Sequence, residues 1–144
     1  MSLLLALATM GCRSFSGPGS ASFASVTIKN HTAEEIAAAT AKVFTADGYQ
    51  GYRNASGEMK FEKEASRATS LARDGIADTY YGSSTINRVR VEIVPLGEDA
   101  FRLQCKAFMV TGGSDTFFQD EVPLANFRSG PYQSLLKKVA KQLE

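Results

Sequence analysis

The sequence is short of the residues from which most enzyme active sites and metal sites are built. Its 144 residues include one histidine, His31, two cysteines and no tryptophan. It has no CxxC or HExxH pattern and no glycine-rich pattern that could cradle a phosphate. The acidic residues around Gly112 and Gly113 lack the spacing of a calcium loop. We therefore expect no catalytic residue, no metal and no cofactor, and we expect that the protein is not an enzyme.

An excess of charge of one sign is also missing. Sixteen basic and fifteen acidic side chains give a net charge of +1, and they are scattered along the chain. A nucleic-acid-binding protein needs a clustered basic face, so we expect no nucleic acid among the partners. The hydrophobic share of 44% is enough to bury a core, and we expect one domain over residues 23–144.

The apolar run near the N-terminus is too short to cross a membrane as a helix, which needs about 20 residues. It covers Leu3 to Ala8 and leads through small residues to Gly11 and Cys12. The stretch resembles the end of a bacterial lipoprotein signal peptide. That resemblance implies that residues 1–11 are removed and that the Cys12 thiol carries a diacylglycerol. The alternatives are an ordinary signal peptide, or an apolar tail with an accidental cysteine.

The same resemblance implies a place in the cell. The protein would be anchored by lipid in the bacterial cell envelope and would face the periplasm. Arg13, not Asp, follows Cys12, which favours the outer membrane. Residues 12–22 are rich in Ser and Gly, a composition typical of a flexible tether.

The rest of the chain shows the patterns of a mixed α and β protein. Thr32 and Glu35 fit a capping box, which predicts a helix over residues 33–46 that ends at Asp47 and Gly48. Pro131 suits the first turn of a second helix, over residues 131–143. Alternating apolar residues predict strands at 23–29, 49–53 and 58–63, a hairpin over 87–110 with its turn at 95–99, and a short strand within 116–124. Residues 65–84 fit either an irregular strand or a long loop.

This order predicts an α+β fold of two layers. We expect a curved antiparallel sheet with an N-terminal-half helix and a C-terminal helix packed on one face, in the order β-α-β-β-(β)-β-β-α. The order resembles helix-grip and TBP-like domains. The stretches 48–50 (GYQ) and 57–62 (GEMKFE) are similar to a pattern in BamC-type accessory lipoproteins of the outer-membrane barrel assembly machinery. The resemblance implies no functional residue. Arg88, Arg90, Arg102 and Lys106 predict a polar, mainly basic outer face on the hairpin.

Few single residues stand out as candidates for function. We expect His31 to pack or cap at the first helix, and Cys105 to lie in the core as a small apolar residue. Aromatic residues in segments without clean alternation are candidates for partner or ligand contact, unless they close the open end of the sheet. The candidates are Tyr80, Tyr81, Phe117, Phe118 and Phe127. Tyr132 shares their pattern.

Two functions fit these observations. The first is a non-catalytic cell-envelope lipoprotein that binds or scaffolds an envelope protein through protein contacts, with the membrane as a second partner through the lipid on Cys12. The alternative is a carrier of a small apolar ligand, held in the cleft between the sheet and the C-terminal helix.

Overall fold

A computed structural model describes residues 23–53, 58–65, 85–111 and 119–144 of the chain. The predicted signal peptide and tether, with the lipidation residue Cys12, lie outside these residues. So do four of the five candidate contact residues: Tyr80, Tyr81, Phe117 and Phe118. The predictions made for them therefore stay predictions.

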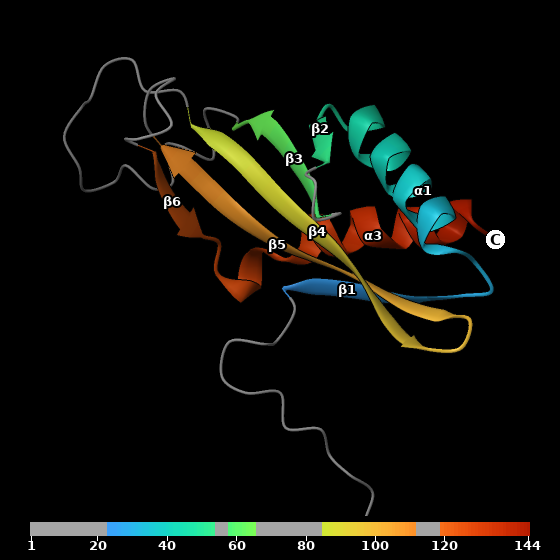
Figure 1. Cartoon of the computed structure of the whole chain (residues 1–144). Coiled ribbons are helices and arrows are strands. Elements are labelled where there is room, and N and C mark those ends of the chain that lie inside the picture. Colours follow the sequence, from blue (N-terminus) through green and yellow to red (C-terminus); the bar gives the residue numbers. More distant parts are fainter. Residues whose placement is uncertain (1–22, 54–57, 66–84, 112–118) are drawn as a thin grey trace, which may run out of the picture.

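The fold is the expected α+β arrangement of one antiparallel sheet and two helices (Figure 1). Along the sheet the strands are ordered β1-β5-β4-β3-β2, and β6 also pairs with β5. Strand β1 pairs with residues 100–105 of β5 and β6 with residues 108–111, so both lie against β5 at different heights. The strands are β1 Ala24–Lys29, β2 Gln50–Arg53, β3 Met59–Glu64, β4 Ile86–Gly97, β5 Ala100–Thr111 and β6 Asp120–Pro123.

Helix α1 (Ala33–Ala46) begins at the predicted capping box. The Thr32 hydroxyl accepts a hydrogen bond from the Glu35 backbone N–H at 3.2 Å, and the Glu35 carboxylate accepts one from the Thr32 N–H at 2.8 Å. Gly48 then takes a φ of +89°, the left-handed conformation that ends the helix. The chain turns directly into β2, which places Tyr49 between α1 and the sheet.

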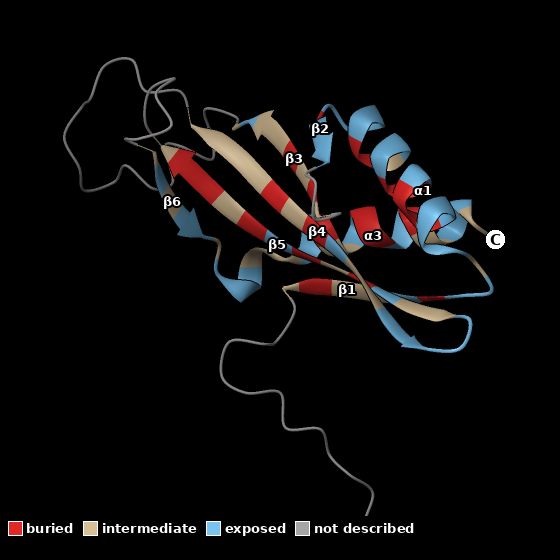
Figure 2. Ribbon diagram, viewed as in Figure 1, coloured by how far each residue is buried: buried red, intermediate tan, exposed pale blue. Residues whose placement is uncertain are grey.

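The second helix, α3 (Gly130–Gln142), lies across the same face of the sheet as α1 and contacts α1, β1 and β5. It follows a short 3-10 turn, η2 (Asn126–Arg128). The core fills the space between the helices and the inner face of the sheet, where the buried residues cluster (Figure 2). Its fully buried members include Ile36, Phe44, Phe61, Val89, Val91, Leu103, Leu136 and Val139.

The hairpin turn differs from the one predicted. The sequence predicted a turn at residues 95–99, but β4 continues through Pro95 to Gly97, and the turn holds only Glu98 and Asp99. Strand β3 pairs with β4 only at residues 86–91, so β4 has β5 alone beside it at Pro95. A proline without an N–H is tolerated at such an edge, and a bulge between Pro95 and Gly97 adjusts the register.

The outer face of the sheet is polar, as predicted, but acidic partners balance much of its basic charge. The Arg88 guanidinium is 2.7 Å from a Glu62 carboxylate oxygen and 3.4 Å from one of Glu121. Arg90 lies 2.9 Å from the same Glu121 oxygen. Arg88 is only 13% exposed, so these are partly buried ion pairs that join β4 to β3 and β6. Pairing across strands, which one strand's sequence cannot reveal, makes this face less basic than expected.

Candidate functional site

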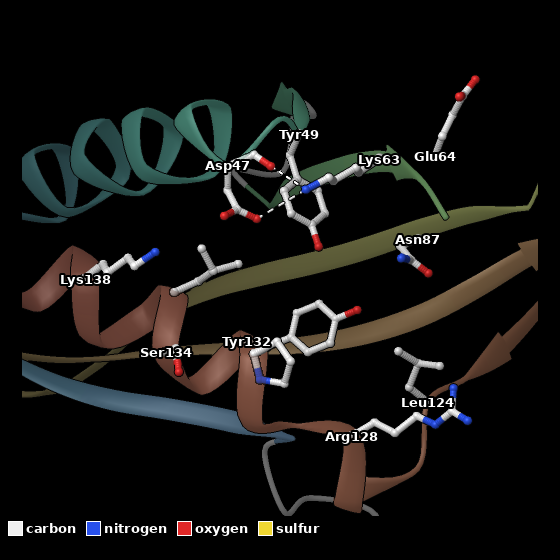
Figure 3. Close-up of a pocket in the computed structure, with 12 residues that line it drawn as sticks. Asp47, Tyr49, Lys63, Glu64, Asn87, Leu124, Arg128, Tyr132, Ser134 and Lys138 are labelled. Atoms are coloured by element: carbon white, nitrogen blue, oxygen red, sulfur yellow. Dashed lines mark hydrogen bonds and ion pairs between the residues drawn. The ribbon is translucent and has the colours of Figure 1, made fainter. Parts of the chain in front are cut away.

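The candidate site is a cleft of about 700 Å³ between the sheet and α3 (Figure 3). This volume lies in the range of small-molecule sites, about 300–1,000 Å³. The end of α1, strands β3 and β4, and the first half of α3 form its walls. It is lined by Asp47, Tyr49, Lys63, Glu64, Asn87, Leu124, Arg128, Pro131, Tyr132, Ser134, Leu135 and Lys138.

Two tyrosines from different elements face each other across the cleft. Tyr49 comes from the end of α1 and Tyr132 from the first turn of α3, and each is 7% exposed (Figure 3). The Tyr49 ring packs on Phe44 at a centroid distance of 5.4 Å, and the Tyr132 ring packs on Phe23 at 5.3 Å. The core therefore holds both rings in place.

Burial sets the protonation state of this pair. Burial, together with the nearby Tyr132, raises the pKa of Tyr49 well above its usual range. Burial also raises the pKa of Tyr132. Both hydroxyls therefore stay protonated at neutral pH. The two hydroxyls also interact with each other, so the pair can offer one donor to a bound molecule but is poorly suited to act as a general base.

Charged side chains lie on both sides of the cleft. Lys63 is engaged: its ammonium donates to the Asp47 backbone carbonyl, lies 3.5 Å from the Asp47 carboxylate and sits 5.3 Å from the Tyr49 ring centroid. Arg128 and Lys138 have no carboxylate within ion-pair distance among the residues that the structure describes. The α3 side of the cleft is therefore positive.

Asn87 lines the cleft from β4 and carries an unsatisfied polar atom. Its side-chain oxygen is buried, and among the residues that the structure describes it has no hydrogen-bond partner. An unpaired buried acceptor costs about 1–3 kcal/mol, so folded proteins hold few of them. The cleft thus combines apolar surface, a phenol donor, free cations and one unsatisfied amide.

The structure places three sequence-predicted residues. Phe127 is 84% exposed on η2, beside the α3 end of the cleft. His31 lies at the start of α1, with its Nδ1 3.4 Å from the Glu35 carboxylate, as expected for a residue that caps or packs there. Cys105 is buried in the core as predicted, and burial raises the pKa of its thiol to about 12. These residues do not form one site.

The sequence does not reveal most of the residues that line the cleft. Its patterns predict only that Tyr49 starts a strand and that Asn87 belongs to a hairpin, whereas Tyr132 shares the pattern of the aromatic candidates. One signal was present for Tyr49: an aromatic residue directly after the helix-ending Gly48 must lie where helix and sheet meet. No local pattern marks Asn87, because the lack of a hydrogen-bond partner for its side-chain oxygen depends on side chains from other elements.

Among the described residues, no group of three or more metal-ligating side chains lies close enough together to hold an ion. No helix in the described ranges is long and apolar enough to cross a membrane.

Comparison with known proteins adds little. No family model matches the chain, and no curated protein matches it. Among solved structures, the adenylate sensor from AMP-activated protein kinase, in complex with 5-aminoimidazole-4-carboxamide 1-β-D-ribofuranotide, is similar at a TM-score of 0.45. The two share 15% sequence identity, and the match covers 82% of this chain and 93% of that one. A likeness at this level carries no inference about what the cleft binds.

Proposed function

We propose that this protein is a non-catalytic binding protein of the bacterial cell envelope that holds a small amphipathic ligand in the cleft between the sheet and α3. The observation that carries the proposal is the cleft of about 700 Å³ with Tyr49 and Tyr132 facing across it. Their rings offer an apolar surface to a ligand, and the pair of protonated hydroxyls offers one hydrogen-bond donor.

The lining argues for an amphipathic ligand over the purely apolar one that the sequence predicted. Leu124, Leu135 and the two tyrosine rings suit an apolar or aromatic body. Arg128 and Lys138 suit an anionic group at the α3 side. An apolar molecule would leave these polar groups without partners, which costs affinity.

Binding of a defined probe tests the proposal. The probe 1-anilinonaphthalene-8-sulfonate has an aromatic body and one anionic group, and amide NMR spectra report where it binds. We expect saturable binding of one probe, with shifts concentrated at Tyr49, Asn87 and Ser134. Ser134→Trp should block the cleft and weaken binding at least tenfold. The control Lys137→Trp places the same side chain on the solvent side of α3 and should leave binding unchanged. Equal binding by the two variants, or no saturable binding by the unmodified chain, would reject the proposal.

The envelope location is the second part of the proposal, and it depends on the sequence around Cys12. Intact mass of the protein extracted from membranes of its native host tests it. We expect a mass that lacks residues 1–11 and carries a diacylglyceryl group, with neither change in a Cys12→Ala variant. A soluble, unprocessed chain would reject the anchor and leave the cleft proposal standing.

A role through protein contacts remains the second candidate function. Phe127 favours it, because its aromatic side chain is 84% exposed and aromatic residues are enriched at protein interfaces. A photo-crosslinking amino acid at position 127, introduced in the native host, tests this role. It should capture a protein that the same amino acid at the control position 52 does not capture.

A further inference from the structure

The segment that contains η2 and α3 carries a concentration of positive charge. Residues 126–143 hold four basic side chains, Arg128, Lys137, Lys138 and Lys141, and no acidic one. The whole chain has a net charge of +1, so the other residues sum to −3. The even scatter of charge expected from the sequence therefore does not hold here. The three lysines are exposed, and within the described ranges none has a carboxylate at ion-pair distance.

An exposed aromatic side chain stands at the end of this basic surface. Phe127 is 84% exposed, against 37–51% for the other large exposed hydrophobic residues that the structure describes. The Arg128 guanidinium lies 5.6 Å from its ring centroid. Exposed aromatic residues flanked by cations are typical of protein surfaces that sit in the headgroup region of anionic membranes. We call Phe127, Arg128 and the three lysines the basic face.

The N-terminal segment joins the domain beside this face. The Ser25 backbone N–H donates to the Gln133 side-chain oxygen at 3.1 Å, and the Gln133 amide donates to the Ser25 carbonyl at 2.8 Å. The Phe23 ring packs on Tyr132 in the first turn of α3. The start of β1 is therefore fixed to the first half of α3. Figure 1 shows the chain entering β1 close to the turn between β6 and α3.

The length of the preceding segment limits how far this end can lie from an anchor. Eleven residues, 12–22, separate the candidate lipidation site from Phe23. Fully extended, they span at most about 40 Å. Under the proposed lipid anchor, the start of β1 and the first turn of α3 therefore lie within about 40 Å of the membrane.

We infer that the basic face binds an anionic lipid surface and orients the domain on the membrane. Phe127, Arg128 and the point of attachment lie at the N-terminal end of α3, and the three lysines continue the positive charge along the second half of the helix. The cleft opens beside the same face, since Arg128 and Lys138 belong to both. The anionic groups of the membrane and of the proposed ligand would then meet the same cations. The position of the domain at a cell membrane rests on the proposed lipid anchor. The affinity of the basic face for anionic lipid does not rest on it.

The absence of tryptophan makes a direct test simple. Phe127→Trp, in the full chain with Cys12→Ala, carries a single tryptophan as a reporter. Mixed with vesicles of 30% phosphatidylglycerol in phosphatidylcholine, its emission should shift to the blue and be quenched by lipids with brominated chains. Pure phosphatidylcholine vesicles should produce neither effect. The matched control Tyr52→Trp, in the same chain, places the reporter on β2 at a residue that is 51% exposed, and its emission should stay unchanged.

Charge variants identify the source of the affinity. Each lysine close to an anionic surface strengthens binding about fivefold, so Lys137→Gln with Lys141→Gln should lower the partition coefficient about 25-fold. The matched pair Lys60→Gln with Lys106→Gln removes the same charge from the outer face of the sheet, which lies opposite the helices, and should change it much less. All variants share residues 1–22, so the apolar N-terminal run cannot account for a difference between them.

Three outcomes would overturn the inference. The first is binding without a preference for phosphatidylglycerol, and the second is an equal fall in the partition coefficient for the two lysine pairs. The third is a Phe127→Trp emission that vesicles do not change, together with crosslinking of position 127 to a protein in the host. Because the chain tested is Cys12→Ala and the assay uses no cleft ligand, these results do not depend on lipidation or on probe binding.

Discussion

Gly51→Ala should destabilise the protein because a Cβ atom at this position has no room. It would lie 2.8 Å from Cε1 and 3.1 Å from Cδ1 of Phe61, the residue opposite in strand β3. The Phe61 ring is 2% exposed and stacks on Phe44 at 4.5 Å, so it cannot move aside without disturbing the core. Overpacking of this kind costs about 1–3 kcal/mol. The lost flexibility of the unfolded chain returns about 0.4–1 kcal/mol. We therefore expect a net loss of about 1–2 kcal/mol.

A double-mutant cycle with Phe61→Leu isolates the cause. Urea unfolding followed by circular dichroism gives the free energy of unfolding for the four proteins. Leu lacks the ring atoms that crowd position 51, so Gly51→Ala should be neutral or slightly stabilising in the Phe61→Leu background. The coupling between the two positions should then be about 1–3 kcal/mol. If Gly51→Ala costs the same in both backgrounds, the steric argument is refuted.

Four further predictions concern the two residues of the capping box, the buried thiol and the outer ion pairs. Thr32→Ala removes the capping box and should lower the free energy of unfolding by about 1 kcal/mol, measured by urea unfolding. The hydrogen bond from the Thr32 N–H lowers the pKa of the exposed Glu35 carboxylate below 4.5. The wild-type chain should therefore have a higher free energy of unfolding than Glu35→Gln above pH 4.5. This difference should disappear as the pH falls through the folded-state pKa. Cys105, whose thiol is buried with a pKa of about 12, should resist alkylation at pH 8 and react only in urea, as peptide mapping would show. Arg88→Met removes the 2.7 Å partner of Glu62 and leaves it only Lys60 at 3.6 Å. It should cost about 1.5–3 kcal/mol, with faster amide exchange in β6.

The fold followed from local signals, and the order of the elements also predicted a cleft between the sheet and the C-terminal helix, but the residues that line this cleft were not predicted. The capping box at Thr32 and Glu35, the Gly48 stop and the alternation in the long hairpin each act over a few residues, so the sequence alone predicted α1, β4 and β5 closely. Local signals fail at Pro95. The sequence predicts a turn there, but Pro95 can lie within β4 because β3 ends before it and leaves that edge of β4 unpaired. The cleft depends on tertiary contacts throughout. Tyr49, Asn87 and Tyr132 are 38 or more residues apart along the chain, and no local pattern brings them together.

Strand β1 pairs with β5, which lies far away in the sequence, and this pairing has a consequence for the order of folding. The β4–β5 pairs lie close in sequence, so this hairpin can form early with little loop entropy to overcome. Ala24 of β1 instead pairs with Cys105, which lies 81 residues later in the chain. During synthesis β1 emerges first but must wait for β5 before it can pair, and the apolar side of β1 stays uncovered until then. The strand that attaches the domain to its N-terminal segment is therefore expected to be among the last to dock, so that folding ends at the point where the domain would be held to the membrane.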